Sequence, residues 1–415
     1  MDITIPRGSL NGRLTPPCSK SYAQRALALS LLAEGESVLR NIEFCNDTLS
    51  AIRCIESLGA SVRRIDDSTV AVRGGFAPKS SVLEVGESGL STRLFTPIAS
   101  LATEPIVVNG CGTILHRPMA MMVEPLRKLG VEVRDGGGYL PIEVKGPIRG
   151  GEIEVDGSLS SQFITGLLLA LPLAKEETTL HVHGAVSTPY IDMTIDTAKR
   201  FGGHILHNDY SEFFIEGGQH YKATDFAIEG DWSAAAMLLV AGAIAGEVTL
   251  DNISTLSLQA DTAICSALVR AGASVINEEN SITVAKRDLQ AFEFDATNCP
   301  DLFPALAALA AAADGESVII GTRRLEHKES NRAETLRDEY AKLGIDIDIS
   351  TDNVMKIRGG EIHSAEVDGR QDHRIAMSLA VSALRSDGAV DIRGAECVEK
   401  SYPDFFKDLE HLRVK

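Results

Sequence analysis

The stretch Ser19-Lys20-Ser21-Tyr22-Ala23-Gln24-Arg25 opens a run of small and apolar residues, 26–33, that is typical of a buried helix. A helix N-terminus carries roughly half a positive charge, so Lys20 and Arg25 are unfavourable there unless an anion lies opposite them. Residues four positions apart in this stretch share one side of the helix with its free backbone N–H groups. The stretch therefore predicts an anion site. The alternative is a solvated basic turn capped by Ser19.

The same construction recurs along the chain. Polar or glycine-rich helix starts followed by Ala/Leu-rich runs lie 69 to 72 positions apart, at Ser19, Ser88, Ser160, Asp231, Asp301 and Asp372. Glycines that end a helix before an alternating strand keep a second register of 70 to 72 positions, at Gly59, Gly130, Gly202, Gly272 and Gly344. Two registers held over this length predict six copies of a unit of about 70 residues, which is longer than a solenoid repeat.

Each copy has the pattern helix, strand, helix, strand, usually with a further short strand before the next copy. In the first copy we expect a strand at 36–40 and a second helix at 47–58. The second helices of the later copies are expected at 117–129, 189–201, 261–271, 328–343 and 402–412. Pro118, Pro189 and Pro403 suit helix starts, and Gly136-Gly137-Gly138 suits the turn of a hairpin between 133 and 142.

Composition excludes several classes of function. The 415 residues carry a net charge of −18, which argues against nucleic acid and anionic membranes as partners. The longest apolar runs, 234–246 and 305–313, are too short to span a bilayer, and the N-terminus lacks the pattern of a signal peptide. Seven cysteines without CxxC spacing favour reduced thiols in the cytoplasm. His181 and His183 share a strand face without a Cys or carboxylate partner in the pattern, so we expect no metal site there.

The polar residues at the helix starts form one set. If three copies surround an axis and two such trios face each other, their helix N-termini converge on the gap, and the gap is electropositive. First-helix starts supply Lys20, Ser21, Arg25, Arg93, Ser160, Ser161, Gln162, Asp301 and Arg374. Second-helix starts supply Arg117, Ser187, Tyr190, Lys328, Glu329, Arg332 and Lys400. Two carboxylates among many cations predict a phosphate-rich ligand and acid/base chemistry.

These residues, in this order, resemble the 5-enolpyruvylshikimate-3-phosphate synthase family over essentially the whole chain. The matching motifs are Ser19-Lys20-Ser21 with Arg25, Arg117-Pro118, Ser160-Ser161-Gln162, Ser187 with Pro189-Tyr190, Asp301, Lys328-Glu329 with Arg332, Asp372-His373-Arg374, and Lys400 with Pro403-Asp404. The resemblance implies an α/β fold, a two-domain inside-out α/β barrel in which each domain holds three βαβαββ units. One domain is expected at 19–228, the other at 1–18 with 229–415, and the active site in the cleft between them.

The resemblance also implies a reaction. Members transfer the enolpyruvyl group of phosphoenolpyruvate to the 5-hydroxyl of shikimate 3-phosphate and release phosphate, a step of the shikimate pathway toward chorismate and the aromatic amino acids. The family needs no metal and no organic cofactor. We therefore expect two small-molecule substrates, no nucleic-acid or membrane partner, and a cytoplasmic monomer.

Residue roles follow from the same resemblance. Shikimate 3-phosphate is expected to contact Ser21, Arg25, Ser160, Ser161, Gln162, Ser187 and Lys328, and Tyr190 and Asp301 are further substrate-binding residues. Phosphoenolpyruvate is expected to contact Lys20, Gly89, Arg117, Arg332, Arg374 and Lys400, with Gln162 next to both substrates. Asp301 would accept the 5-hydroxyl proton, Glu329 would protonate the enol methylene, and Lys20 would assist when the adduct expels phosphate. The alternatives are that Asp301 merely caps a helix and that Glu329 merely pairs with Arg332.

Some positions depart from the family pattern, and two other functions compete with it. Glu87 places a carboxylate beside the expected anion site, Leu90 removes a hydroxyl, and Arg324 replaces a common Asn. The sister family that acts on UDP-N-acetylglucosamine has a reactive cysteine five residues before an Arg-Pro pair, whereas Cys111 lies six residues before Arg117. A non-catalytic repeat scaffold for an acidic partner would need its cations on an outer face instead of at helix starts.

Overall fold

The structure is a computed structural model that describes residues 1–326 and 328–414. The described residues divide into two compact units. One unit is Cys18–Glu229, and the other combines Met1–Pro17 with Gly230–Lys415. The second unit is therefore built from both ends of the chain, with the first unit inserted between them in sequence.

The sheets of Cys18–Glu229 share one design. Their strand orders are β16-β4-β6-β5, β7-β8-β10-β9 and β11-β12-β14-β13, and β15 pairs with β3. In each of the larger sheets the first two strands are parallel and the others antiparallel, which is the expected repeat. The strands are β3 Ala33–Glu34, β4 Glu36–Arg40, β5 Ser61–Arg64, β6 Thr69–Arg73, β7 Val82–Glu84, β8 Ile106–Asn109, β9 Glu132–Asp135, β10 Ile142–Lys145, β11 Gly151–Asp156, β12 Thr178–His183, β13 Leu206–Asn208, β14 Glu212–Ile215, β15 Tyr221–Lys222 and β16 Asp225–Ala227.

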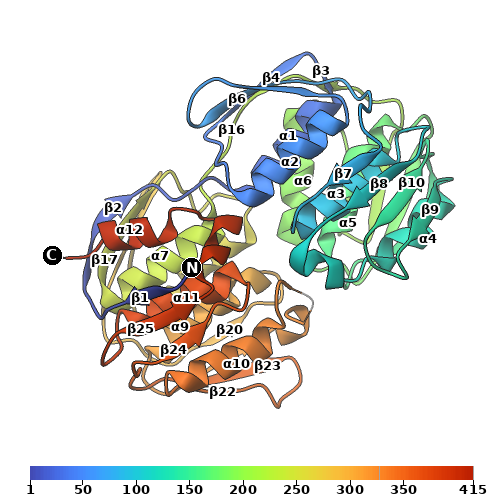
Figure 1. Cartoon of the computed structure of the whole chain (residues 1–415). Coiled ribbons are helices and arrows are strands. Elements are labelled where there is room, and N and C mark those ends of the chain that lie inside the picture. The colour runs from blue at the N-terminus through green and yellow to red at the C-terminus, as the bar shows by residue number, and fades with distance from the viewer. Residues whose placement is uncertain (327, 415) are drawn as a thin grey trace. The chain divides into compact units, whose positions relative to one another are not determined.

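The helices α1, α3 and α5 form the interior of this unit, with the sheets around them (Figure 1). Every residue of α3 is buried, and α5 is buried except at Gln162. A helix that is apolar all round belongs in a core, which explains the Ala/Leu-rich runs after each polar start. The helical segments are α1 Lys20–Leu32, α2 Asn46–Ser57, α3 Gly89–Ala99, η1 Gly112–His116, η2 Ala120–Met122, α4 Val123–Lys128, α5 Ser161–Ala170, η3 Leu171–Leu173 and α6 Thr188–Arg200.

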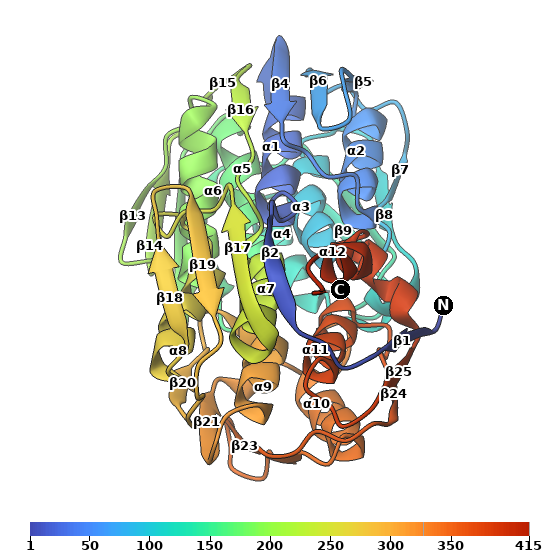
Figure 2. The same ribbon diagram turned by 90° about the vertical axis from the view of Figure 1, so that its left-hand side faces the viewer.

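The unit formed by Met1–Pro17 and Gly230–Lys415 repeats the design. Its strand orders are β18-β19-β17-β2, β20-β21-β23-β22 and β1-β25-β24. Strand β2 lies beside β17, and β1 lies beside β25 (Figure 2). The pairing of β2 with β17 is parallel, whereas β1 and β25 are antiparallel with Ile3 opposite Ile392. The strands are β1 Ile3–Ile5, β2 Leu10–Leu14, β17 Gly246–Asp251, β18 Ser274–Asn277, β19 Ser281–Ala285, β20 Glu293–Asp295, β21 Glu316–Ile320, β22 Asp346–Asp348, β23 Val354–Arg358, β24 Glu366–Asp368 and β25 Val390–Arg393.

The helices α7, α9 and α11 form the interior of this second unit. All residues of α9 and α11 are buried. The helical segments are α7 Trp232–Ala245, η4 Ala260–Ala263, α8 Ile264–Arg270, η5 Pro300–Leu302, α9 Phe303–Ala311, η6 Thr322–Arg324, α10 Arg332–Lys342, α11 His373–Ala383, η7 Ala395–Lys400 and α12 Phe405–His411. In residues 1–326 and 328–414, no helix has both the length and the apolar character that crossing a bilayer requires.

The helix starts predicted from the repeat are confirmed, with one informative exception. The side chains of Ser19, Ser88, Ser160, Asp231 and Asp372 each accept a hydrogen bond from a backbone N–H in the first turn of the following helix. Such caps satisfy donors that a helix leaves unpaired. Asp301 keeps the register but lies within η5, and the residue before α9 is Leu302. The alternative considered for Asp301, that it merely caps this helix, is therefore wrong.

The second helices were predicted less well. Pro189 lies in the first turn of α6, as expected, but the helix predicted from 117 does not begin there. Arg117 is extended, and helical structure resumes at Ala120. The residue before a proline avoids the α region, and Pro118 follows Arg117. Likewise α12 begins after Pro403, and α10 begins four residues later than predicted, at Arg332.

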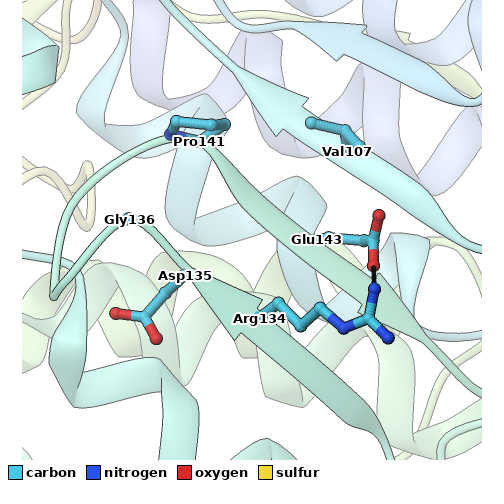
Figure 3. Close-up of a pocket in the computed structure, with 6 residues that line it drawn as sticks. All are labelled: Val107, Arg134, Asp135, Gly136, Pro141 and Glu143. Atoms are coloured by element: carbon cyan, nitrogen blue, oxygen red, sulfur yellow. Dashed lines mark hydrogen bonds and ion pairs between the residues drawn. The ribbon is translucent and has the colours of Figure 1, made fainter.

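The hairpin predicted around Gly136-Gly137-Gly138 is confirmed, because β9 and β10 pair antiparallel on either side of it. A cavity of about 260 Å³ lies over this sheet, and Arg134 donates a hydrogen bond to Glu143 beside it (Figure 3). Its lining residues are Val107, Arg134, Asp135, Gly136, Pro141 and Glu143, none of which was predicted as a site residue.

Candidate active site

Arg332 is the centre of a charged cluster in the unit that contains both chain ends. It is the first residue of α10, and its side chain is 0 % exposed. Its Nη1 donates to Oδ1 of Asp301 at 2.7 Å, its Nη2 to Oε2 of Glu329 at 2.7 Å, and its Nε to Oδ2 of Asp372 at 2.8 Å. One guanidinium thus holds three carboxylates, as the planar, multiply donating shape of arginine allows.

Asp301 lies in η5, and further cations surround it. Lys328 Nζ donates to its Oδ1 at 3.2 Å, and a guanidinium nitrogen of Arg374 lies 3.6 Å from its Oδ2. Arg374 is near the start of α11, whose N-cap is Asp372. Predicted site residues from η5, the segment before α10, and α11 therefore meet at one carboxylate.

The charges of this cluster set the pKa of Asp301. Burial alone would raise this pKa, but the charges of Lys328, Arg374 and Arg332 outweigh burial and hold it well below its usual range. Burial lowers the pKa of Lys328, although the charge of Asp301 opposes that shift. Asp301 is therefore ionised, and the same positive charges make it a weak proton acceptor.

Glu329 forms an ion pair with Arg332, three positions later in the sequence. The pairing expected from the sequence as the alternative role of Glu329 therefore exists in the structure. Its side chain retains some exposure, unlike Arg332. Lys400, at the last residue of η7, is buried in the same unit.

Two carboxylates near this cluster were missed as site residues. Asp372 was recognised as a helix start and as part of the Asp372-His373-Arg374 motif but was given no role in the site, yet it both caps α11 and binds Arg332. Asp261, in η4, is 1 % exposed and accepts a hydrogen bond from Ser233. Burial and the charge of Asp301 raise the pKa of Asp261 to about 7. Its place at the start of a second helix was a usable signal, because such starts supplied other predicted site residues.

In the unit Cys18–Glu229, Lys20 is the first residue of α1, and its Nζ lies 3.0 Å from Oδ2 of Asp47 in α2. Both side chains are largely buried. The chain itself thus supplies one anion beside this helix start. An ammonium held in this way remains close to the N-terminal end of α1.

Arg25 is the second cation of the opening stretch, and it is buried. Its guanidinium donates to the hydroxyls of Thr194 and Thr165 and to the backbone oxygens of Ser21 and Tyr190. Burial lowers the pKa of Arg25 to about 10. Arg25 therefore joins α1, α5 and α6, and it fixes the backbone at two predicted substrate-binding residues.

Gln162 has its amide orientation set by a neighbour. Nη1 of Arg93, in α3, donates to Oε1 of Gln162 at 2.9 Å, and Nη2 donates to the backbone oxygen of Pro118 at 3.2 Å. With its oxygen engaged, Gln162 presents its NH₂ group as a donor, which suits an anionic ligand. Ser160 caps the same helix and Ser161 is its first residue.

Gly89 and Arg117 approach each other closely. A Cβ added to Gly89, the first residue of α3, would lie 2.6 Å from Nη1 of Arg117. A larger residue at this helix start would require the guanidinium of Arg117 to shift. Ser187, the N-cap of α6, has a φ of 53°. Non-glycine residues with such strained left-handed backbone conformations occur often at functional sites.

The carboxylate of Glu87, expected from the sequence beside the anion site, has a hydrogen-bonding partner of its own. Its Oε2 accepts hydrogen bonds from the hydroxyl and the backbone N–H of Thr113, at 3.0 and 3.4 Å. Thr113 lies in the first turn of η1, whose N–H groups favour a negative charge. The structure thus gives Glu87 a local partner that the sequence pattern did not indicate.

Comparisons with known proteins agree along the whole chain. The family model described as EPSP synthase (3-phosphoshikimate 1-carboxyvinyltransferase) matches residues 5–409. A 3-phosphoshikimate 1-carboxyvinyltransferase of Clostridium perfringens (strain SM101 / Type A) is 35% identical over 99% of this chain and 98% of its own. One of Methanosarcina acetivorans is 38% identical over 100% and 98%. A solved EPSP synthase of Acinetobacter baumannii has a TM-score of 0.85 and 27% identity, and the match covers 100% of this chain and 98% of that one.

Proposed function

The chain belongs to the EPSP synthase family and is a 3-phosphoshikimate 1-carboxyvinyltransferase of the shikimate pathway, and we propose that the residues predicted from its sequence perform the reaction. The fold class expected from the sequence, a two-domain α/β fold, is confirmed by the match to solved EPSP synthases. The family match does not favour the alternatives of a UDP-N-acetylglucosamine enolpyruvyl transferase or a non-catalytic scaffold.

The observation that carries the proposal is that Arg332 holds both predicted catalytic carboxylates, Asp301 and Glu329. Addition followed by elimination needs one group for the hydroxyl proton and another for the methylene carbon. A shared guanidinium fixes the two carboxylates relative to each other, and this arrangement preorganises the acid and the base.

In the addition step, Asp301 accepts the proton of the 5-hydroxyl of shikimate 3-phosphate while that oxygen bonds to C2 of phosphoenolpyruvate. Glu329 begins this step as the protonated acid. Its proton converts the C3 methylene to a methyl group, which leaves Glu329 as the carboxylate that pairs with Arg332. Anionic substrates that bind Lys328, Arg374 and Arg332 offset the cations that lower the pKa of Asp301. Substrate binding thus raises that pKa toward the range of a working base.

In the elimination step, Glu329 takes a proton back from C3, and the bond from C2 to the phosphate oxygen breaks. Phosphate leaves with the assistance of Lys20 and carries away the proton that Asp301 took from the 5-hydroxyl, so both carboxylates return to their starting states. The products are 5-enolpyruvylshikimate 3-phosphate and phosphate. Protons and a phosphate group move, and no electrons pass to an acceptor, so the balance requires no redox cofactor. The proposal therefore includes neither a metal nor an organic cofactor.

For the substrates, we propose a division between the two units. Residues of 19–228 bind mainly shikimate 3-phosphate, supported by the donor orientation of Gln162 and the caps at the helix starts. The unit of 1–18 and 229–415 contributes Asp301, Glu329 and the arginines for phosphoenolpyruvate. We propose that residues of both units take part in the reaction.

We also propose that the enzyme acts as a monomer in the cytoplasm. The net charge of −18 favours separate molecules in solution, and the odd number of cysteines favours a reducing compartment. Analytical ultracentrifugation tests the first part, since a dimer would have twice the mass.

A phosphate-release assay tests the function. Phosphate should appear only when phosphoenolpyruvate and shikimate 3-phosphate are both present. Replacing shikimate 3-phosphate by UDP-N-acetylglucosamine should give no phosphate. Phosphate release from phosphoenolpyruvate when UDP-N-acetylglucosamine is the sole acceptor, or when no acceptor is present, would overturn the proposal.

A further inference from the structure

Glu339 is a buried carboxylate in α10 that the proposed mechanism does not use. It lies seven positions after Arg332, so the two residues share one face of the helix. Both side chains are fully buried. Buried carboxylates need charged or hydrogen-bonding partners, so the partners of Glu339 indicate what it does.

Those partners come mainly from the last residue of β24 and from the segment that follows it, before α11. The backbone N–H of Asp368 donates to Oε2 of Glu339 at 2.9 Å, and Nε of Arg370 donates to Oε1 at 2.8 Å. Within α10, Nζ of Lys342 donates to Oε2 at 2.6 Å. Glu339 therefore holds the segment at two points, two residues apart.

The segment that Glu339 holds is strained. Arg370 and Gln371 have φ angles of 51° and 56°, in the left-handed region that non-glycine residues avoid. Two such residues in succession persist only when the surrounding contacts fix them. The contacts within the segment are Arg370 N to Asp368 Oδ1 at 2.6 Å and Asp372 N to Gly369 O at 2.9 Å.

The strained segment leads directly into the charged cluster. Its next residue is Asp372, which caps α11 and accepts a hydrogen bond from Arg332. Arg374 follows, within 3.6 Å of Asp301. Helix α10 thus contacts this part of the chain twice, through Arg332 at Asp372 and through Glu339 at Asp368 and Arg370.

We propose that Glu339 is a positioning residue for phosphoenolpyruvate binding, because it holds the strained segment 368–371 in the conformation that places Asp372 and Arg374. This inference rests on the proposed function, in which Arg374 binds phosphoenolpyruvate. Glu339 acts through these residues and does not contact the substrate itself.

The test compares Glu339→Gln with Glu334→Gln, the same chemical change at an exposed position of the same helix. We expect E339Q to raise KM for phosphoenolpyruvate about tenfold, the factor that corresponds to loss of one charge-assisted hydrogen bond. KM for shikimate 3-phosphate and kcat should stay within about twofold, because the residues assigned to them are unchanged. E334Q should match the wild type.

A second substitution tests the strain itself. Gln371→Gly removes the cost of the left-handed conformation at an exposed side chain, so the double variant E339Q/Q371G should recover most of the lost affinity for phosphoenolpyruvate. A double variant no better than E339Q, or an unchanged KM in E339Q, would overturn the proposal. If E339Q does not fold, Arg370→Ala breaks one of the same contacts from the exposed side and should raise the same KM.

Amide hydrogen exchange separates this proposal from the proposed function. Exchange at residues 368–372 should be faster in E339Q than in E334Q, and the measurement requires no turnover. A wild-type protein without phosphate release would contradict the function and leave this result intact. Equal exchange in the two variants would contradict the role of Glu339 even in an active enzyme.

Discussion

The Nε of Arg332 donates to Oδ2 of Asp372 across 2.8 Å, and both side chains are fully buried. Asp372 also accepts from the backbone N–H of Arg374 with its other oxygen, at 3.0 Å. The start of α10 and the start of α11 are thus joined through one carboxylate. A change at Asp372 should affect both the stability of the fold and the placement of the two arginines.

Asp372→Ala should lower the free energy of unfolding by about 3 kcal/mol, because it removes a buried partner of Arg332 together with a helix cap. Two carboxylates still face Arg332 in the variant, so the decrease in the free energy of unfolding should lie at the low end of the range for breaking a buried ion pair. Urea unfolding measures the change. Asp352→Ala breaks an exposed pair with Arg323 and should cost far less, because solvent screens that pair. Equal losses in the two variants would show that burial of the Arg332 pair has no special effect.

Asp301→Asn should reduce turnover about a hundredfold, because the amide cannot accept the hydroxyl proton. The change preserves shape, so the protein should remain folded and should still bind shikimate 3-phosphate. Steady-state kinetics together with calorimetric binding provide the measurement. Glu316→Gln, at an exposed ion pair on β21, serves as the matched control and should leave turnover unchanged. Normal turnover in D301N would remove Asp301 from the mechanism.

Glu329→Gln should suppress proton transfer at the methylene carbon about a hundredfold. In deuterated water the wild type should introduce deuterium at C3 of the enolpyruvyl group during turnover, and E329Q should do so far more slowly. Mass spectrometry of the product and of recovered phosphoenolpyruvate measures this exchange. If E329Q turns over as fast as the wild type and introduces as much deuterium at C3 per turnover, the proton transfer belongs to another residue.

Asp261→Asn should change how stability depends on pH. Since burial and the charge of Asp301 raise the pKa of Asp261 to about 7 from 3.8, the folded protein binds this proton more tightly than the unfolded chain does. The associated stabilisation is complete at acidic pH and is lost as the pH rises toward and above 7. The neutral variant keeps an acceptor for Ser233 and should therefore gain stability relative to the wild type between pH 5 and pH 8. The gain should be at most about 1.4 kcal/mol for each pH unit over which only the folded protein holds the proton.

Unfolding free energies of D261N and the wild type at pH 5 and pH 8 measure this effect. Asp301 contributes with the opposite sign, because its pKa is lowered and its stabilisation is lost as the pH falls below about 4. A constant difference between D261N and the wild type across this range would show that Asp261 is ionised at both pH values.

Gly89→Ala should weaken phosphoenolpyruvate binding about tenfold, because the new Cβ would displace the buried guanidinium of Arg117 by a distance that binding does not tolerate. KM values for the two substrates measure the effect, and KM for shikimate 3-phosphate should change little. Gly360→Ala places a methyl group where no atom lies within 4 Å and is the matched control. Unchanged kinetics in G89A would show that Arg117 adapts without loss.

The repeat made much of the fold predictable. Helix caps such as Ser19 and Ser88 are local, because a hydroxyl and the following N–H groups lie within one turn of sequence. The register of these caps therefore placed the first helices well. The predicted starts of several second helices rested on prolines. The start predicted at 117 was wrong, because Pro118 keeps the preceding residue, Arg117, extended.

The site was predictable as a set of residues and much less as a set of contacts. The partnership of Lys20 with Asp47 and that of Glu87 with Thr113 depend on how separate segments pack. Asp261 was missed for a related reason. Its raised pKa arises from burial and from a carboxylate 40 positions away in sequence, and neither is visible in the local pattern.

The pairing of β2 with β17 and of β1 with β25 has a consequence for biosynthesis. As the polypeptide leaves the ribosome, residues 18–229 emerge as a complete folding unit, whereas the first strands must wait for partners made much later. Ile3 pairs with Ile392, so this early strand is among the last to reach its native hydrogen bonds. Until then, those N-terminal strands remain exposed edges within reach of chaperones or of neighbouring nascent chains.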